Sequence, residues 1–199
     1  MPQSNACPSV RDSLRAKTAA AHTRLHTHPF FAALLHGSLT RETYTAMLSR
    51  LLGFHGPLEK ELFSAARRLG LESIMQGRRR VPDLELDLQD LGVSQSQLDA
   101  FPQARFQPIV TKDKFFGTLY VREGSTLGGT VLARSLDRLL PNHRGRRFLS
   151  GHQQDSKLWR KFLEELELAG TTGILPVLLE GAEETFAAME AWLNGACSA

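Results

Sequence analysis

Residues 124–129 read Gly-Ser-Thr-Leu-Gly-Gly, in the middle of a segment that otherwise has the composition of a long helix. Together with Gly117, this stretch places four glycines within about four helical turns. A glycine inside a helix costs about 1 kcal/mol relative to alanine, so four of them need a reason. Gly124 and Gly128 are four residues apart and therefore share one face of the helix. A face without side chains lets another helix, or a planar ligand, lie directly against the backbone.

Close packing of two helices is the simpler explanation for small residues at this spacing. Four glycines exceed what a single helix contact needs, and they predict a kinked helix. The excess favours a face turned towards a ligand. The motif alone leaves both explanations open.

Composition is typical of a globular protein. Of the 199 residues, 42% are hydrophobic and 23% are charged, and no apolar run approaches the ~20 residues of a membrane span. A net charge of +3 is too small to indicate nucleic-acid binding. The start of the chain lacks the basic and apolar segments of a signal peptide. We therefore expect a cytoplasmic protein that has neither a membrane nor a nucleic acid as partner.

The chain is predicted to form a single domain over residues 1–199, with flexible ends at 1–8 and 195–199. Its two cysteines, Cys7 and Cys197, give neither a disulfide framework nor a metal-binding spacing. The run Arg78-Arg79-Arg80 precedes a proline in an expected loop. It is interpreted as a solvated surface run.

Nearly every long segment has helical periodicity. The predicted helices run from Ser9 to Pro29, Thr40 to Gly70, Pro82 to Leu91, Ser94 to about Ala100, Thr111 to Pro141, Asp155 to Ala169 and Thr172 to Asn194. No alternating strand pattern and no internal repeat stands out. The sequence therefore predicts an all-α domain of about seven helices, less regular than a four-helix bundle.

His22 lies at the edge of the apolar face of the first predicted helix. Arg15, seven residues earlier, is only about 20° away around the helix and roughly 10 Å along it. A nitrogen ligand with a cation two turns away suits a haem, whose iron is central and whose carboxylates lie at one edge. Two other interpretations stay open, a structural histidine and a zinc ion held by His22 and His26, although no third zinc ligand stands at motif spacing.

Several segments resemble one known family, in order along the chain. Leu14-Arg15-Ala16-Lys17-Thr18 followed by His22 resembles the proximal helix of haem oxygenases. Residues 119–129, Leu-Tyr-Val-Arg-Glu-Gly-Ser-Thr-Leu-Gly-Gly, closely resemble their distal helix. Residues 148–151, 159–163 and 183–193 are similar to the family's later segments. The resemblance spans residues 9–194 and is closest to the bacterial biliverdin-producing enzymes associated with bacterial phytochromes.

The resemblance implies a multi-helical fold in which haem lies between the first helix and the kinked, glycine-rich helix. His22 would be the axial ligand of the iron. Gly124 and Gly128 would let the distal backbone approach the porphyrin and direct an iron hydroperoxide to one meso carbon. Ser125, the third catalytic candidate, occupies the place where many members carry an aspartate that orders water.

Two cations are implied to bind the haem propionates. Arg15 matches a basic position of the family, and Arg160 is the second candidate. The implied reaction uses haem as both substrate and cofactor, consumes O₂ and electrons, and yields biliverdin, CO and Fe²⁺. A ferredoxin or an NADPH-dependent reductase would supply the electrons, and a bacterial phytochrome would accept the biliverdin. The alternative is a non-catalytic haem-binding or haem-delivery protein on the same fold.

His26 departs from the family pattern, since many members carry a carboxylate four residues after the axial histidine. A carboxylate there accepts a hydrogen bond from the second ring nitrogen of the ligand and makes the ligand a stronger donor. Because histidine brings no negative charge, we expect His26→Glu to strengthen haem binding near neutral pH. A haem titration measures this, and an unchanged or weaker affinity would contradict the expectation.

Overall fold

The structure, a computed structural model, describes residues 8–142 and 144–195 and confirms the all-α prediction. Cys7, Cys197 and most of the predicted flexible ends lie outside the described residues. Within the described ranges the α-helices are α1 (Val10–Thr27), α2 (Pro29–Leu35), α3 (Arg41–Leu69), α4 (Val81–Asp90), α5 (Gln95–Ala100), α6 (Lys112–Ala133), α7 (Arg147–Ser150), α8 (Asp155–Thr172) and α9 (Leu175–Leu193). A short 3₁₀ helix, η1 (Arg134–Leu136), continues α6. None of the described helices is long and apolar enough to cross a membrane.

The helix starts follow the caps in the sequence. Ser9, Thr40 and Thr111 each accept a hydrogen bond from a backbone N–H of the first turn, and Gly70 ends α3 in the left-handed conformation. Pro29 was expected only to end the first helix. It also occupies the first position of α2, where a proline has no N–H to lose and its φ already suits a helix.

Several elements differ from the predictions. The short α2 and α7 were not predicted. The glycine-bearing helix α6 ends at Ala133 and passes through η1, instead of continuing to Pro141. The helix α8 extends to Thr172, past Gly170, and Gly173 is its C-cap.

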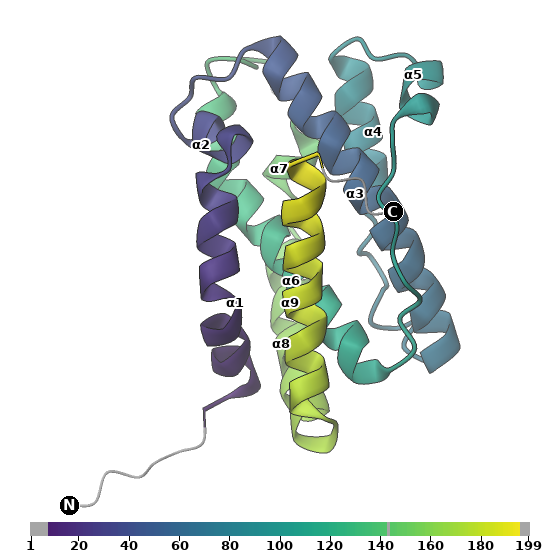
Figure 1. Ribbon diagram of the computed structural model, residues 1–199. Coiled ribbons are helices and arrows are strands. Elements are labelled where there is room, and N and C mark those ends of the chain that lie inside the picture. Colours follow the sequence, from purple (N-terminus) through teal and green to yellow (C-terminus); the bar gives the residue numbers. More distant parts are fainter. Residues whose placement is uncertain (1–7, 143, 196–199) are drawn as a thin grey trace, which may run out of the picture.

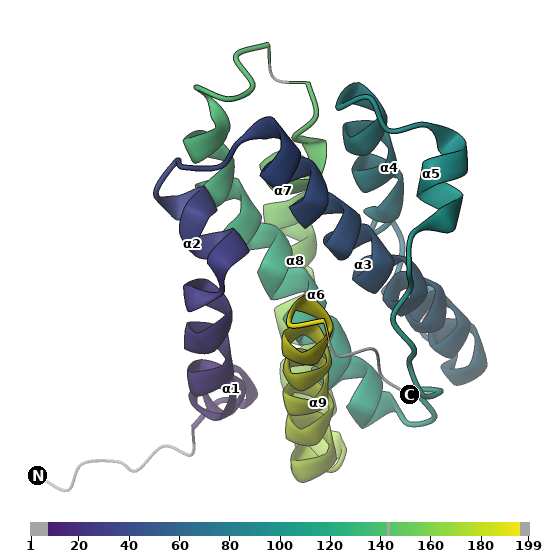
Figure 2. The same ribbon diagram turned by 45° about the horizontal axis from the view of Figure 1, so that its top comes forward.

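Four helices pack together in the part of the fold that carries the predicted site. The helix α9 packs on α6, which passes obliquely behind it, and α1 packs against α9 and α8 (Figure 1). On the other side of the molecule α4 packs on α3 (Figure 2). The core between these layers is built from large side chains that are almost fully buried, among them Leu14, Tyr44, Phe54, Phe115 and Phe162. The two helices predicted to hold haem, α1 and α6, thus share α9 and α8 as neighbours.

Candidate functional site

The imidazole of His22 remains partly exposed on α1. Its ring lies beside that of His26, with ring centroids 4.4 Å apart, and meets Phe186 of α9 edge-on at 6.3 Å. Partial desolvation, and secondarily His26, lower the pKa of His22 below its usual range. The side chain is therefore neutral near pH 7 and has a lone pair free to bind a metal.

The rings of His22 and His26 touch but do not hydrogen-bond in the structure. The supporting interaction that a carboxylate would give at position 26 is thus absent between these two side chains. Among the described residues, no group of three or more His, Cys, Asp and Glu lies close enough to hold a metal ion. That result disfavours a zinc site made by His22, His26 and a third side chain.

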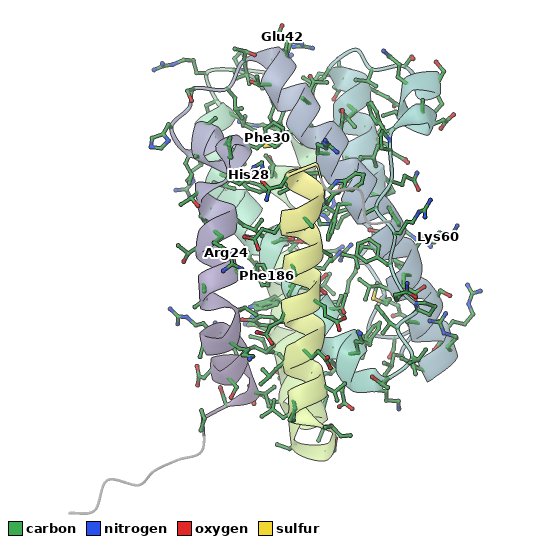
Figure 3. The ribbon with its side chains drawn as sticks, viewed as in Figure 1. Arg24, His28, Phe30, Glu42, Lys60 and Phe186 are labelled. Carbon is green, nitrogen blue, oxygen red and sulfur yellow. The ribbon has the colours of Figure 1, made fainter. Side chains whose placement is uncertain are left out.

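An ion pair and two backbone hydrogen bonds hold α1 against its neighbours. Arg24 binds the carboxylate of Glu190 on α9 through two nitrogens, at 2.5 and 3.0 Å, and the side chains of Arg24 and Phe186 lie between the two helices (Figure 3). At the start of α1, the backbone N–H groups of Val10 and Arg11 donate to Glu167 of α8, each at 2.9 Å. Because both ends of α1 are held, the position of His22 relative to α9 is set by the fold.

Two of the four glycines of α6 are needed for packing. A Cβ atom on Gly117 would lie 2.0 Å from the carbonyl oxygen of Leu178 on α9. A Cβ on Gly129 would lie 3.1 Å from the carbonyl oxygen of Leu149 on α7. Both distances are shorter than an ordinary contact, so the backbones meet there only because no side chain intervenes.

The other two glycines face open space. A Cβ atom on Gly124 or Gly128 would have no neighbour within 4 Å outside its own helix backbone. No packed helix explains these two positions. Close packing is therefore the explanation for Gly117 and Gly129, whereas a ligand-facing role of Gly124 and Gly128 stays a prediction. Gly124 and Gly128 form a bare strip of backbone, which we call the open face.

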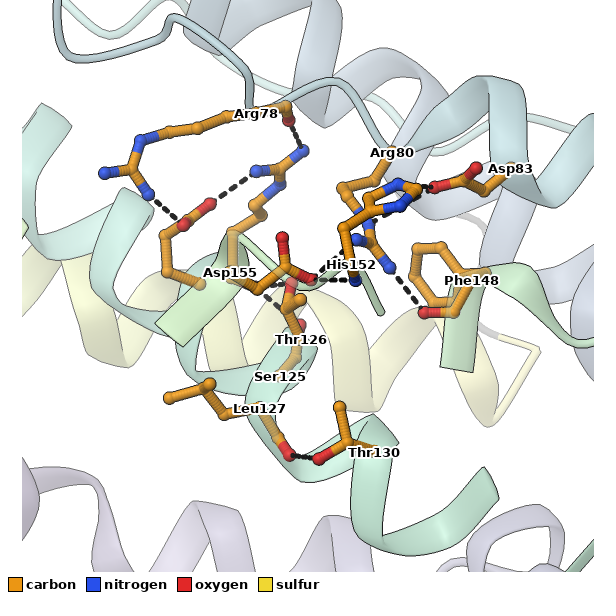
Figure 4. Close-up of polar contacts among 12 residues, drawn as sticks. Arg78, Arg80, Asp83, Ser125, Thr126, Leu127, Thr130, Phe148, His152 and Asp155 are labelled. Atoms are coloured by element: carbon orange, nitrogen blue, oxygen red, sulfur yellow. Dashed lines mark hydrogen bonds and ion pairs between the residues drawn. The ribbon is translucent and has the colours of Figure 1, made fainter. Parts of the chain in front are cut away.

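The hydroxyl groups around the open face bond back to the helix. Ser125 donates to the carbonyl oxygen of Arg122 at 2.6 Å, and Thr130 donates to that of Leu127 at 2.8 Å (Figure 4). Such bonds leave the oxygen lone pairs free to accept from water, and they favour bending of a helix. The helix α6 nevertheless stays α-helical throughout 112–133, and the expected kink stays a prediction.

A buried ion cluster holds the residues that immediately precede Gly124. Glu123 pairs with Arg78 and with Arg122, and Arg122 also donates to Glu59 of α3 at 2.9 Å. Arg78 donates in addition to the carbonyl oxygen of Leu158 on α8 at 2.8 Å. The start of the open face is thereby tied to α3, to the segment before α4 and to α8.

The cluster continues through Arg80. This side chain donates to Asp155 at 2.9 Å and to the carbonyl oxygen of Phe148 at 2.7 Å (Figure 4). Burial, followed by the charges of Arg122 and Arg80, lowers the pKa of the nearby His55 to about 3. His55 therefore stays neutral and adds no further positive charge to the cluster.

The interpretation of residues 78–80 as a solvated run was wrong for two of the three. Arg78 and Arg80 are each only 3% exposed, whereas Arg79 is exposed. Their partners come from distant parts of the chain, which a local composition cannot reveal. One indication was available: Glu59 lies between Leu58 and Leu62 on the apolar face of α3, where a carboxylate needs a buried cation.

The two predicted propionate ligands have different surroundings. Arg15 is exposed on α1. Burial raises the pKa of Tyr120 on α6, and the nearby positive charges of Arg11 and Arg15 oppose that rise. Arg160 is exposed on α8, and no described contact brings it to His22 or to the open face. Its neighbour Trp159 packs on Tyr120, with ring centroids 5.8 Å apart.

The sequence model of a protein family described as Heme oxygenase matches residues 9–195. The chain belongs to the haem oxygenase family. A curated relative from Xanthomonas campestris, named heme oxygenase, is 35% identical over 140 residues, which cover 68% of this chain and 78% of the relative. The enzyme class expected from the sequence, an oxidoreductase that acts on haem, is thereby confirmed.

Solved structures of the family confirm the fold. The haem oxygenase of Neisseria meningitidis, studied with NO and CO bound, has a TM-score of 0.70 at 24% identity and covers 94% of this chain and 92% of its own. That of Leptospira interrogans has a TM-score of 0.72 at 22% identity, with 94% and 98% covered. Haem oxygenase-1 of Synechocystis, in complex with haem, has a TM-score of 0.67 at 18% identity, with 94% and 91% covered.

The division of the glycines leads to a prediction about stability in this haem oxygenase. We expect Gly117→Ala to destabilise the fold by about 2 kcal/mol or more, because the new methyl group forces α6 and α9 apart. Gly124→Ala should instead stabilise it by about 0.5–1 kcal/mol, because alanine is the better helix former and meets nothing. Urea denaturation of the two variants measures the difference. Equal effects on the free energy of unfolding would contradict the assignment of the open face.

Proposed function

We propose that this haem oxygenase binds haem between α1 and α6 and opens it to biliverdin, carbon monoxide and iron. The observation that carries the proposal is the open face. Gly124 and Gly128 have no packing partner, although two other glycines of the same helix are packed tightly. A flat ring system against bare backbone would use the space that these two residues leave.

The proximal contact is assigned to His22. Bound haem supplies the iron that activates O₂ and the ring that is opened. The neutral imidazole of His22 would ligate that iron from α1, and it lacks the electron push with which a thiolate favours O–O cleavage. Phe186 and the Arg24–Glu190 pair hold this part of α1 against α9, so the position of the imidazole relative to α9 is fixed.

The distal contacts are assigned to the backbone at Gly124 and Gly128 and to the hydroxyl of Ser125. The bare backbone would let the ring and the bound oxygen approach closely, and a kink in α6 would block all but one ring edge. Ser125 can accept a hydrogen bond from water while it donates to Arg122, and would so hold a water that delivers protons. Arg15 would pair with a propionate, and Arg160 is the second candidate for that role.

The proposal extends to partners and location. Electrons would come from a ferredoxin or an NADPH-dependent reductase in the cytoplasm. A bacterial phytochrome would receive the biliverdin, in keeping with the resemblance of the sequence to enzymes of that type.

Reconstitution with haemin tests the proposal. A ferredoxin–reductase system is added in air, with catalase present to remove free peroxide. Loss of the Soret band with growth of biliverdin absorption supports it. A haem complex that forms but never opens would replace it with the haem-binding or haem-delivery alternative, and failure to bind haemin would refute the assigned site.

A further inference from the structure

A hollow of about 940 Å³ lies between α3, residues 72–79 and residues 152–157. Residues 76–80 contribute to both the lining of this hollow and the buried ion cluster. Gln76, Gly77 and Arg79 line the hollow, whereas Arg78 and Arg80 point into the cluster. The hollow contains neither His22 nor any residue of the open face, so the proposed haem site leaves it without a role. Its volume lies in the range of sites for small organic ligands.

Among the described residues, no carboxylate pairs with the arginine and lysine side chains of this hollow, whereas its histidine, His152, contacts Asp83. Arg67, Arg79 and Lys157 line it and are exposed, and none forms an ion pair with a described residue. Nearby arginines behave differently, since Arg68 pairs with Glu61 and Arg80 with Asp155. Glu72 is the one carboxylate among the lining residues. The lining therefore carries an excess of positive charge that the described part of the protein does not neutralise.

The hollow also has an apolar side. The half-buried ring of Phe63 contributes to its wall, and the guanidinium of Arg79 lies over that ring, with its carbon 4.3 Å from the ring centroid. Ala66 and Met75 also line the hollow, but each is only 1% exposed. An apolar wall next to cations suits a molecule that has both kinds of surface.

The first turn of α8 places Lys157 at the hollow. The backbone N–H groups of Asp155 and Lys157 already donate to the carbonyl oxygens of His152 and Gln154, each at 3.0 Å. This end of α8 therefore contributes the charge of Lys157 to the hollow.

We propose that this hollow binds a small amphipathic anion. The apolar body of the ligand lies against Phe63, and its carboxylate, sulfonate or phosphate group pairs with Arg79 and Lys157. This site is separate from that of haem, and both can be filled together.

Calorimetric titration with 8-anilinonaphthalene-1-sulfonate, a compact amphipathic anion, tests this site. The protein is first loaded with haemin, so that the proposed haem site is filled. One site per chain is expected, with an affinity that falls as salt is added. The double variant R79Q/K157Q should bind about tenfold more weakly, because it loses both charges that pair with the ligand. The charge-preserving variant R79K/K157R should bind nearly as well as the original chain.

The matched control is R105Q/K112Q, which removes two exposed cations that do not line the hollow. It should leave the affinity unchanged. The inference is overturned if the haemin-loaded protein binds no probe. It is also overturned if R105Q/K112Q weakens binding as much as R79Q/K157Q does. Haemin affinity, read from the Soret band, should be the same in every variant. If the chain binds no haemin, the proposed function fails, and the same comparison on the ligand-free protein still decides the anion site.

Discussion

Replacing His22 with alanine is expected to abolish haem turnover and to remove the absorption spectrum of imidazole-ligated haem. Loss of a partner that only supports a metal ligand costs about 10–100-fold in affinity, so loss of the ligand itself should cost about 100-fold or more. The ring of His22 is partly exposed and makes no hydrogen bond in the structure. The free energy of unfolding should therefore change by no more than about 0.5 kcal/mol.

Two control variants make this result specific. His36→Ala removes an exposed histidine that bonds only to Ala32 of its own helix, and it should leave the haem spectrum unchanged. His26→Ala removes the ring next to His22 and should weaken haem binding without abolishing it. If His26→Ala, and not His22→Ala, removes the spectrum, the axial ligand is His26. Survival of both Soret band and turnover in His22→Ala would show the assignment to be wrong.

Glu123→Ala is expected to destabilise the protein by about 3–5 kcal/mol. The substitution leaves two buried guanidinium groups, those of Arg78 and Arg122, without the carboxylate they share. Arg122 keeps Glu59, but Arg78 would keep only carbonyl oxygens as partners. Denaturation by urea measures the loss. Since this residue directly precedes Gly124, haem affinity should fall as well, even where the variant remains folded.

Glu183→Ala is the matched control for that loss. Its pair with Lys17 joins α9 to α1 at 3.3 Å, but both side chains are about half exposed. An exposed pair of this kind contributes less than about 1 kcal/mol. A loss as small as this in Glu123→Ala would mean that water or rearranged side chains compensate the buried charges, and that the cluster does not hold α6.

The helices could largely be predicted from the sequence because their determinants are local. Ser9, Thr40 and Thr111 cap helices where their spacing to the first apolar residues indicates. Pro29 is compatible with both the end of one helix and the start of the next, so sequence alone did not separate α1 from α2. The end of α6 has no breaker at Ala133, and the change to a 3₁₀ turn depends on packing.

The candidate site was predictable only in part. The motif indicated that something lies close to α6, but only the positions of α7 and α9 distinguish Gly117 and Gly129 from the open face. These partners are remote in the sequence. The buried cluster was missed for the same reason, since Arg78 and Glu123 are 45 residues apart. The roles of His22 and Arg15 rest on the resemblance, and they stay predictions until haem is bound.

The four glycines of α6 differ in their surroundings, and we expect this protein to tolerate substitutions at them differently. Gly117 and Gly129 are constrained by folding itself, because any side chain there meets a neighbouring backbone. Gly124 and Gly128 meet nothing, so selection for a folded, abundant protein would let them drift towards better helix formers. If the proposed function is correct, only selection for catalysis would retain them. In a library of variants sorted once for abundance and once for haem conversion, positions 117 and 129 would be depleted in both sortings, and positions 124 and 128 only in the second.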